Sequence, residues 1–284
     1  MTRGPVARRS PALAAFFGPW FERFAARHLN AIRVAAWGMP DVATDAPVVV
    51  WTNHPSWWDA ALYVVLNRRL FAGRAGFGPM DAAMVRRHRF FERIGAFPVE
   101  MGTARGAAAF LEAAHDVLSA RRRVLWVAAQ GRFADVRDRP LGLRPGIARL
   151  PEIAPHAIFL PMAIECAFWT ERGAEALVAF GPPMTGTRLS TLERRARLAR
   201  MEAALADTMD RLADDVRSRD PARFRTVLAG RSGIGGVSDL WRGTAARWRG
   251  VPFDPAHGAG PLHPLSPGPP PPGGRDSQRG RTLP

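Results

Sequence analysis

The sequence predicts an α/β fold, because short apolar runs alternate with segments of helical periodicity over much of the chain. Hydrophobic residues make up 47% of the 284 residues and charged residues 23%, which excludes a wholly disordered chain. The length suits one larger domain or two small ones. No stretch reaches 18 uninterrupted apolar residues, so we expect no transmembrane helix.

The N-terminal region is basic and aromatic. We expect residues 1–11 to be flexible and residues 12–37 to form an amphipathic helix, with Pro19 as a candidate break. Aromatic residues beside arginines suit a helix that lies among lipid headgroups, so we expect residues 12–40 to associate with a membrane. A helix packed on the protein's own core fits the pattern equally well. The aromatic stripe comprises Phe16, Phe17, Trp20, Phe21 and Phe24.

Most of the predicted strands and helices lie in the central part of the chain, where the two alternate. We expect strands at residues 47–51, 95–99, 124–129, 158–168 and 176–180, and helices at residues 56–70, 106–121 and 190–218. Ser190 and Glu193 have the spacing of a capping box at the start of the last helix. Residues 251–284 hold ten prolines and little hydrophobic content, so we expect a disordered tail. Residues 41–250 then form the α/β domain.

The charge favours an anionic partner. All 40 basic residues are arginine and the net charge is +15, part of which reflects codon bias. A membrane surface, a phosphorylated ligand and nucleic acid all remain open on charge alone. Trp241 and Trp248 lie among arginines, a pattern that can hold single strands, although no nucleic-acid module is recognisable. The single cysteine, Cys166, excludes an internal disulfide and argues against a Cys-based zinc site.

One polar cluster lies where a predicted strand gives way to a helix, at residues 51–59. Such junctions place side chains at the open end of a sheet. If the chain turns at Pro55 and enters a helix at Ser56, Asp59 folds back toward the ring of His54. A carboxylate that holds one imidazole nitrogen leaves the other free to accept a proton from a hydroxyl. The alternative is a turn histidine followed by an acid that stabilises the helix dipole.

The pattern Asn-His-x-Ser-x-x-Asp at residues 53–59 resembles motif one of the glycerolipid acyltransferase family, which includes bacterial 1-acylglycerol-3-phosphate acyltransferases. Further segments resemble the later motifs of that family, in the same order, between about residues 45 and 185. They are residues 91–99, 129–132, 141–148, 159–161 and 180–183. The resemblance implies a single domain with a mixed central sheet flanked by helices.

The resemblance also implies a mechanism. His54 removes the proton of an acceptor hydroxyl, Asp59 orients His54, and the oxygen attacks the thioester of acyl-CoA or acyl-carrier protein. No acyl-enzyme is expected, so Cys166 is not required as a nucleophile and Ser56 is interpreted as a helix N-cap. Substrate-binding positions implied by the resemblance are Asn53, Gly95, Phe97, Gln130, Gly131, Arg132 and Pro161. It further implies lipid metabolism without a metal or redox cofactor, in the cytoplasm at the inner face of the membrane.

Two departures from the family pattern concern the acceptor. The second motif of the family usually ends in an arginine, where this chain has Met101, and its third motif has Glu and Arg, where this chain has Gln130 and Phe133. The family arginines grip the phosphate of the acceptor; Arg105 and Arg132 are candidate substitutes. We therefore expect an acceptor without a terminal phosphomonoester, such as another lysolipid, an amino-acid lipid, or a hydroxylated or glycosylated isoprenoid. A non-enzymatic lipid-binding relative is the alternative.

Overall fold

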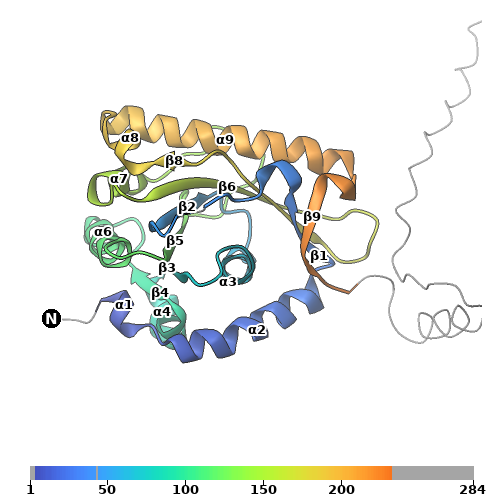
Figure 1. The fold of residues 1–284 in the computed structure, drawn as a ribbon, viewed down its shortest axis with the longest axis horizontal. Helices are drawn as coiled ribbons and strands as arrows, with labels where there is room; N and C mark the ends of the chain where they lie inside the picture. The colour runs from blue at the N-terminus through green and yellow to red at the C-terminus, as the bar shows by residue number, and fades with distance from the viewer. Residues whose placement is uncertain (1–3, 43, 232–284) are drawn as a thin grey trace, which may run out of the picture.

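The computed structural model describes residues 4–42 and 44–231. Within them, nine strands form one mixed sheet with helices on both faces (Figure 1). The strands are β1 (Ala31–Ala35), β2 (Val48–Thr52), β3 (Ala75–Asp81), β4 (Ala96–Val99), β5 (Arg123–Ala128), β6 (Ile158–Ala167), β7 (Glu175–Phe180), β8 (Met184–Thr185) and β9 (Phe224–Ala229). The helices are α1 (Pro5–Arg8), α2 (Pro11–His28), α3 (Asp59–Leu70), α4 (Ala82–Arg87), α5 (Phe90–Ile94), α6 (Ala104–Leu118), α7 (Leu150–Ile153), α8 (Gly186–Ser190) and α9 (Arg194–Ser218).

The sheet has the strand order β4-β3-β5-β2-β6-β7-β1-β9, and β8 pairs with the start of β6. The central strands β5, β2 and β6 are parallel, whereas β7 runs antiparallel to β6 and parallel to β1. The carboxyl ends of β2, β5 and β6 therefore lie at the same edge as the starts of β7 and β1. We call this the site edge.

Helices cover both faces, which is why every residue of β2 is buried. Alternate residues enter two separate cores: Val49 and Trp51 pack toward α9, and Val48 and Val50 pack toward α3. The indole N–H of Trp51 donates to the carbonyl oxygen of Met201 on α9, at 3.3 Å. In Figure 1, α9 runs along one face of the sheet, and α2 lies outside α3 on the other.

The predicted strands and helices of the central region are present, but the N-terminal prediction needs two corrections. The helix expected over residues 12–37 ends at His28, and residues 31–35 form β1, between β7 and β9. Small and β-branched residues occupy both faces of β1, and most of them are buried. Pairing with the two neighbouring strands therefore determines that this segment is a strand and not a helix. The helix passes through Pro19 without ending.

The described residues before α2 are packed against the domain, in place of the flexible segment that composition predicted. The backbone N–H of Val6 donates to the carboxylate of Asp116 on α6, and Arg8 pairs with Glu92 on α5 at 2.7 Å. The proline-rich tail, Trp241 and Trp248 lie outside the described residues. No helix in the described part of the chain is long and apolar enough to cross a membrane.

The long helix α9 begins three residues later than its capping pattern predicted. Glu193 is its N-cap and accepts hydrogen bonds from the N–H groups of Arg195 and Ala196. Ser190 instead ends α8, so Ser190 and Glu193 form no capping box. A carboxylate at this position still satisfies first-turn amides and favours the helix dipole.

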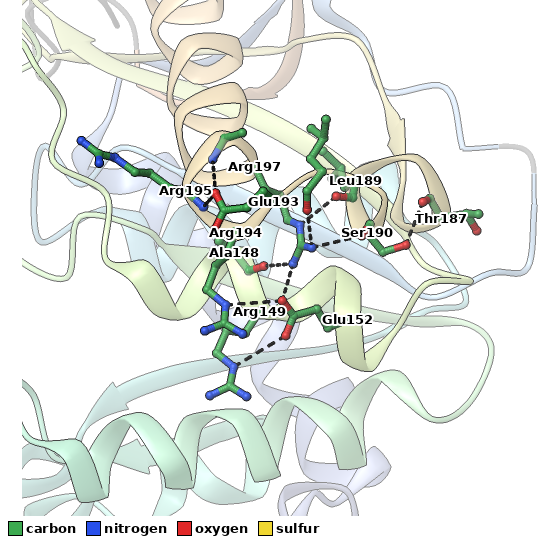
Figure 2. Close-up of polar contacts among 12 residues, drawn as sticks. Ala148, Arg149, Glu152, Thr187, Leu189, Ser190, Glu193, Arg194, Arg195 and Arg197 are labelled. Atoms are coloured by element: carbon green, nitrogen blue, oxygen red, sulfur yellow. Dashed lines mark hydrogen bonds and ion pairs between the residues drawn. The ribbon is translucent and has the colours of Figure 1, made fainter.

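Arg197 fastens the first turn of α9 to the rest of the domain (Figure 2). Its side chain is only 4% exposed and pairs with the Glu152 carboxylate at 2.8 Å. The same guanidinium donates to four backbone carbonyl oxygens, those of Ala148, Leu189, Ser190 and Leu192. One side chain therefore satisfies the ends of several short helical segments at once.

We expect Arg197→Ala to lower the free energy of unfolding by about 3–5 kcal/mol, because it leaves buried carbonyls without a donor and Glu152 without its partner. Urea denaturation of the purified protein measures the change. The exposed Arg200 on the same helix provides the control, and Arg200→Ala should change stability by less than about 0.5 kcal/mol. Equal stabilities for the two variants would contradict this role of Arg197.

Candidate active site

The loop between β2 and α3 carries the predicted polar cluster and lies at the site edge. Asn53 follows β2 directly and is 1% exposed. Its amide donates to the carbonyl oxygen of Ile164 and accepts from the N–H of Ile164, both at 2.8 Å. Because both ends of the amide are used by β6, Asn53 positions the loop. The expected contact of Asn53 with substrate stays a prediction.

His54 and Asp59 make the contact that the sequence predicted. The Nδ1 atom of His54 lies 2.6 Å from the Oδ2 atom of Asp59. The His54 side chain is 25% exposed, whereas the Asp59 side chain is 1% exposed. The bond to a carboxylate favours the tautomer with its proton on Nδ1, so the lone pair of Nε2 can accept a proton.

The surroundings of Asp59 oppose its ionisation in part. Burial raises the pKa of Asp59, and the hydrogen bond and positive potential from His54 act in the other direction. The Ser56 hydroxyl lies 3.5 Å from Oδ1 of Asp59. An ionised Asp59 is thus held by His54 rather than by solvent, which couples the carboxylate to the imidazole.

Tyr63, the only tyrosine of the chain, supports the site from one turn further along α3. The Thr52 hydroxyl donates to the carbonyl oxygen of Asn53 at 2.7 Å, so the Tyr63 hydroxyl donates to Thr52, at 2.6 Å. Burial and the nearby charge of Asp59 raise the pKa of Tyr63 well above its usual value. Tyr63 was not among the predicted site residues, although its position four residues after Asp59 on a helix was an available signal that the two lie close together.

The loop after β5 holds the backbone of His54 on both sides. The side-chain oxygen of Gln130 accepts from the N–H of His54 at 2.9 Å, and the N–H of Ala134 donates to the carbonyl oxygen of His54 at 3.0 Å. The Gln130 amide nitrogen donates to the carbonyl oxygen of Leu141 at 3.0 Å. Gln130 is 2% exposed and positions the backbone of His54; its expected contact with substrate stays a prediction.

Position 130 requires a side chain that both accepts and donates a hydrogen bond. We expect Gln130→Glu to lower the free energy of unfolding at pH 7 by about 1–3 kcal/mol, because an ionised carboxylate cannot donate to the carbonyl of Leu141. The deficit should shrink as the pH falls through the pKa of the introduced carboxyl, since its protonated form can donate again. Urea denaturation at pH 7 and pH 4 measures both effects. A deficit that does not change with pH would exclude this explanation.

Three further residues with an expected substrate role belong to the scaffold. Gly95 ends α5 at a φ of +119°, where a side chain is strained and a Cβ would come within 2.3 Å of the Gly76 carbonyl oxygen. Phe97 is 3% exposed and stacks on Phe110. Pro161 is buried in β6 opposite Trp51. All three residues are buried, and their expected contact with substrate stays a prediction.

The rim of the site is formed by residues around Gly131. The Gly131 N–H donates to the carbonyl oxygen of Ala128, so this amide is used in a turn. The side chains of Arg144 and Met101 lie beside Gly131, where a Cβ would come within 3.0 Å and 3.3 Å of them. Arg132, which was expected to bind substrate, is exposed and donates to the carbonyl oxygen of Phe133. Arg144, which lies beside Gly131, was not among the predicted site residues.

Phe133 covers the imidazole of His54. The two ring centroids lie 4.4 Å apart, and Phe133 is 59% exposed. Met101 is also exposed, at 46%. Phe133 therefore presents apolar surface beside His54, and Met101 presents apolar surface beside Gly131.

The neighbouring hydroxyl and thiol are poor nucleophiles. Burial and the charge of Asp59 raise the pKa of Cys166 to about 11, so the thiol is protonated at neutral pH. The Ser56 hydroxyl accepts from the N–H of Trp58, and α3 begins at Asp59 with Trp58 as its N-cap. Ser56 is thus not the predicted N-cap, although it does satisfy an amide at the start of the helix. The arrangement as a whole suits proton abstraction by His54.

Comparison with protein-family models gives no match, and comparison with curated proteins gives none either. Among solved structures, the chain is similar to the 1-acyl-sn-glycerophosphate (LPA) acyltransferase PlsC from Thermotoga maritima. The two share 13% sequence identity with a TM-score of 0.45, over 70% of this chain and 78% of that chain. In the described residues, no group of three His, Cys, Asp or Glu side chains is placed to hold a metal ion.

Proposed function

We propose that the protein is an O-acyltransferase that moves a fatty acyl group from acyl-CoA or acyl-carrier protein to the hydroxyl of a lysolipid-type acceptor. The observation that carries the proposal is the 2.6 Å contact between His54 and the buried Asp59, with the backbone of His54 fixed on both sides. A preorganised imidazole of this kind is suited to general-base catalysis on a hydroxyl.

The proposed reaction needs no covalent enzyme intermediate. Nε2 of His54 takes the proton of the acceptor hydroxyl while the hydroxyl oxygen bonds to the thioester carbonyl carbon. The tetrahedral intermediate then loses the thiolate, which takes the proton from the imidazolium, and the products are an ester and a free thiol. Arg132 and Arg144, at the rim, supply positive charge for the oxyanion, because the Gly131 N–H is already bonded.

The acceptor proposed here lacks a terminal phosphomonoester. Phe133 and Met101 offer apolar contacts where charge-assisted hydrogen bonds to a phosphate would be needed. We expect the double variant Met101→Arg, Phe133→Arg to raise kcat/KM for a lysophosphatidic acid acceptor about tenfold or more relative to an acceptor without phosphate. Met101→Gln, Phe133→Gln is the neutral control. An equal gain in that control would show that the positive charge of the arginines is not the cause.

The protein is further proposed to act at the inner face of the cytoplasmic membrane. Exposed aromatic side chains extend from α2 to the site, with Phe16 71%, Trp20 50% and Trp57 66% exposed. The ring of Phe24 contacts both Trp20 and Trp57 and so makes the surface continuous. Such a surface suits the boundary between lipid headgroups and acyl chains.

Thiol release in the presence of membranes tests the activity. The wild type receives acyl-CoA or acyl-carrier protein with a panel of lysolipids, hydroxylated isoprenoids and no acceptor. We expect release that depends on the acceptor and is greatest for acceptors without a phosphomonoester. A strong preference for lysophosphatidic acid would refute the acceptor assignment. Absence of release with both donors, from folded protein that binds lipid, would favour a non-enzymatic lipid-binding role.

A further inference from the structure

A basic pocket of about 420 Å³ opens beside the candidate active site. The fold brings its walls together at the site edge through backbone hydrogen bonds. The N–H of Arg231 donates to the carbonyl oxygen of Ala26 at the end of α2, and the N–H of Asn30 donates to the carbonyl oxygen of Ala174 before β7. The lining residues are Arg27, His28, Leu29, Trp58, Phe168, Arg172, Gly173, Ala174 and Arg231.

The lining is strongly positive. It contains three exposed arginines, Arg27, Arg172 and Arg231, and no carboxylate among the described residues that line it. The nearest strand start carries Glu175, but this carboxylate is 3% exposed and is held by Arg33 and Asn30, both at 2.6 Å. Glu175 is therefore already paired and does not serve the pocket arginines. Several guanidinium groups around one cavity suit a phosphate group.

The aromatic residues of the pocket indicate where that phosphate comes from. Phe168 is 68% exposed, and Trp58, which also lines the pocket, packs on Phe24 and His28. Trp57 adds a second exposed ring next to Trp58. Exposed aromatic rings beside arginines are typical of proteins at the headgroup level of a bilayer, where the rings enter the interface and the cations meet phosphates.

We propose that this pocket binds the phosphate of an anionic phospholipid headgroup. Trp58 immediately precedes Asp59, so a headgroup in the pocket holds the bilayer against the same edge that carries His54. The pocket thereby orients the site toward lipid acceptors. The inference rests on the membrane location in the proposed function, and it is independent of the chemistry at His54.

Vesicle sedimentation tests the inference with the full-length protein. The probes are phosphatidylcholine vesicles with and without phosphatidylglycerol. The triple variant Arg27→Ala, Arg172→Ala, Arg231→Ala removes the pocket charge. Arg121→Ala, Arg195→Ala, Arg200→Ala removes the same charge from exposed arginines that do not line the pocket. Thermal melting checks that both variants fold.

We expect the pocket variant to bind phosphatidylglycerol vesicles about 100-fold more weakly than the wild type, at roughly fivefold per arginine. The control variant should lose much less, and binding to pure phosphatidylcholine should be equal in all three proteins. An equal loss in both variants would overturn the inference in favour of diffuse charge. So would unchanged binding by the pocket variant, or failure of the wild type to bind vesicles.

A second arm separates lipid phosphate from the phosphates of a soluble donor. Calorimetric titration with free coenzyme A is compared between the wild type and the pocket variant. Equal affinity supports the lipid assignment, and a selective loss of coenzyme A binding by the pocket variant overturns it. Acyl transfer with a soluble short-chain acceptor is measured in parallel. Activity without vesicle binding refutes this inference and the proposed membrane location but leaves the acyl transfer intact. Vesicle binding through the pocket without activity refutes the proposed acyl transfer and leaves this inference intact.

Discussion

Replacing His54 by alanine is expected to remove acceptor-dependent thiol release almost completely. In the proposed mechanism the imidazole is the base that takes the hydroxyl proton, and general-base catalysis contributes about 10²- to 10⁴-fold to a rate. Apart from His54, the groups close to Asp59 are the protonated thiol of Cys166 and the hydroxyls of Ser56 and Tyr63, none of which accepts a proton readily. We expect kcat to fall by that factor, while KM for the donor changes little.

A second histidine provides the control for the loss of an imidazole that has no catalytic role. His115 is exposed in the last turn of α6 and lies outside the loop that carries His54. His115→Ala should keep the wild-type rate. The proposal fails if His54→Ala is folded, as judged by thermal melting, and retains more than about a tenth of the wild-type kcat.

Replacing Asp59 by asparagine has the second largest expected effect on the rate. The amide presents either an oxygen or an N–H to Nδ1 of His54, so it no longer fixes one tautomer and no longer stabilises the imidazolium. We expect kcat to fall by about 10²-fold, near the lower end of the contribution of a general base. Full activity in Asp59→Asn would show that the carboxylate does not orient His54 for catalysis.

Asp59→Asn is expected to lower the rate but to gain stability, relative to the wild type, as the pH rises. Burial raises the pKa of Asp59 in the folded protein above its unfolded value of about 4. This carboxyl therefore favours folding most below about pH 4, and that contribution is lost as the pH rises through the folded-state pKa. Asparagine does not ionise, so its stability relative to the wild type should improve between pH 4 and pH 7. Urea denaturation at both pH values measures the change, and the opposite trend would contradict this assignment of the shift.

The sequence predicted the centre of the fold better than its flanks. Continuous apolar runs such as β2 and β6 are unambiguous, because strands buried on both faces contain few polar residues. The strand β3 was missed because Gly76, Gly78 and Pro79 resemble a loop, although Gly78 allows close contact with the backbone of β5 and Gly76 leaves room for Asn67 of α3. The strand β1 was read as helix because pairing with β7 and β9 is a non-local effect.

The sequence predicted the contact between His54 and Asp59 but not the hydrogen bonds that position their loop. The spacing of His54 and Asp59 around a turn was sufficient to predict their contact. The positioning roles of Asn53 and Gln130 could not be predicted, because their side chains bond to backbone groups of other segments, at Ile164 and Leu141. The pocket at Arg27, Arg172 and Arg231 likewise depends on three segments that meet only in the fold.

The fate of an isotope-labelled acyl group tests the central claim most directly. The wild type is incubated with a thioester carrying a labelled acyl chain, together with the best acceptor of the panel. We predict that the label appears in an esterified lipid in an amount equal to the thiol released, with none bound to protein. Label on the protein would contradict direct attack assisted by His54, and label found only in free fatty acid would show a thioesterase in place of an acyltransferase.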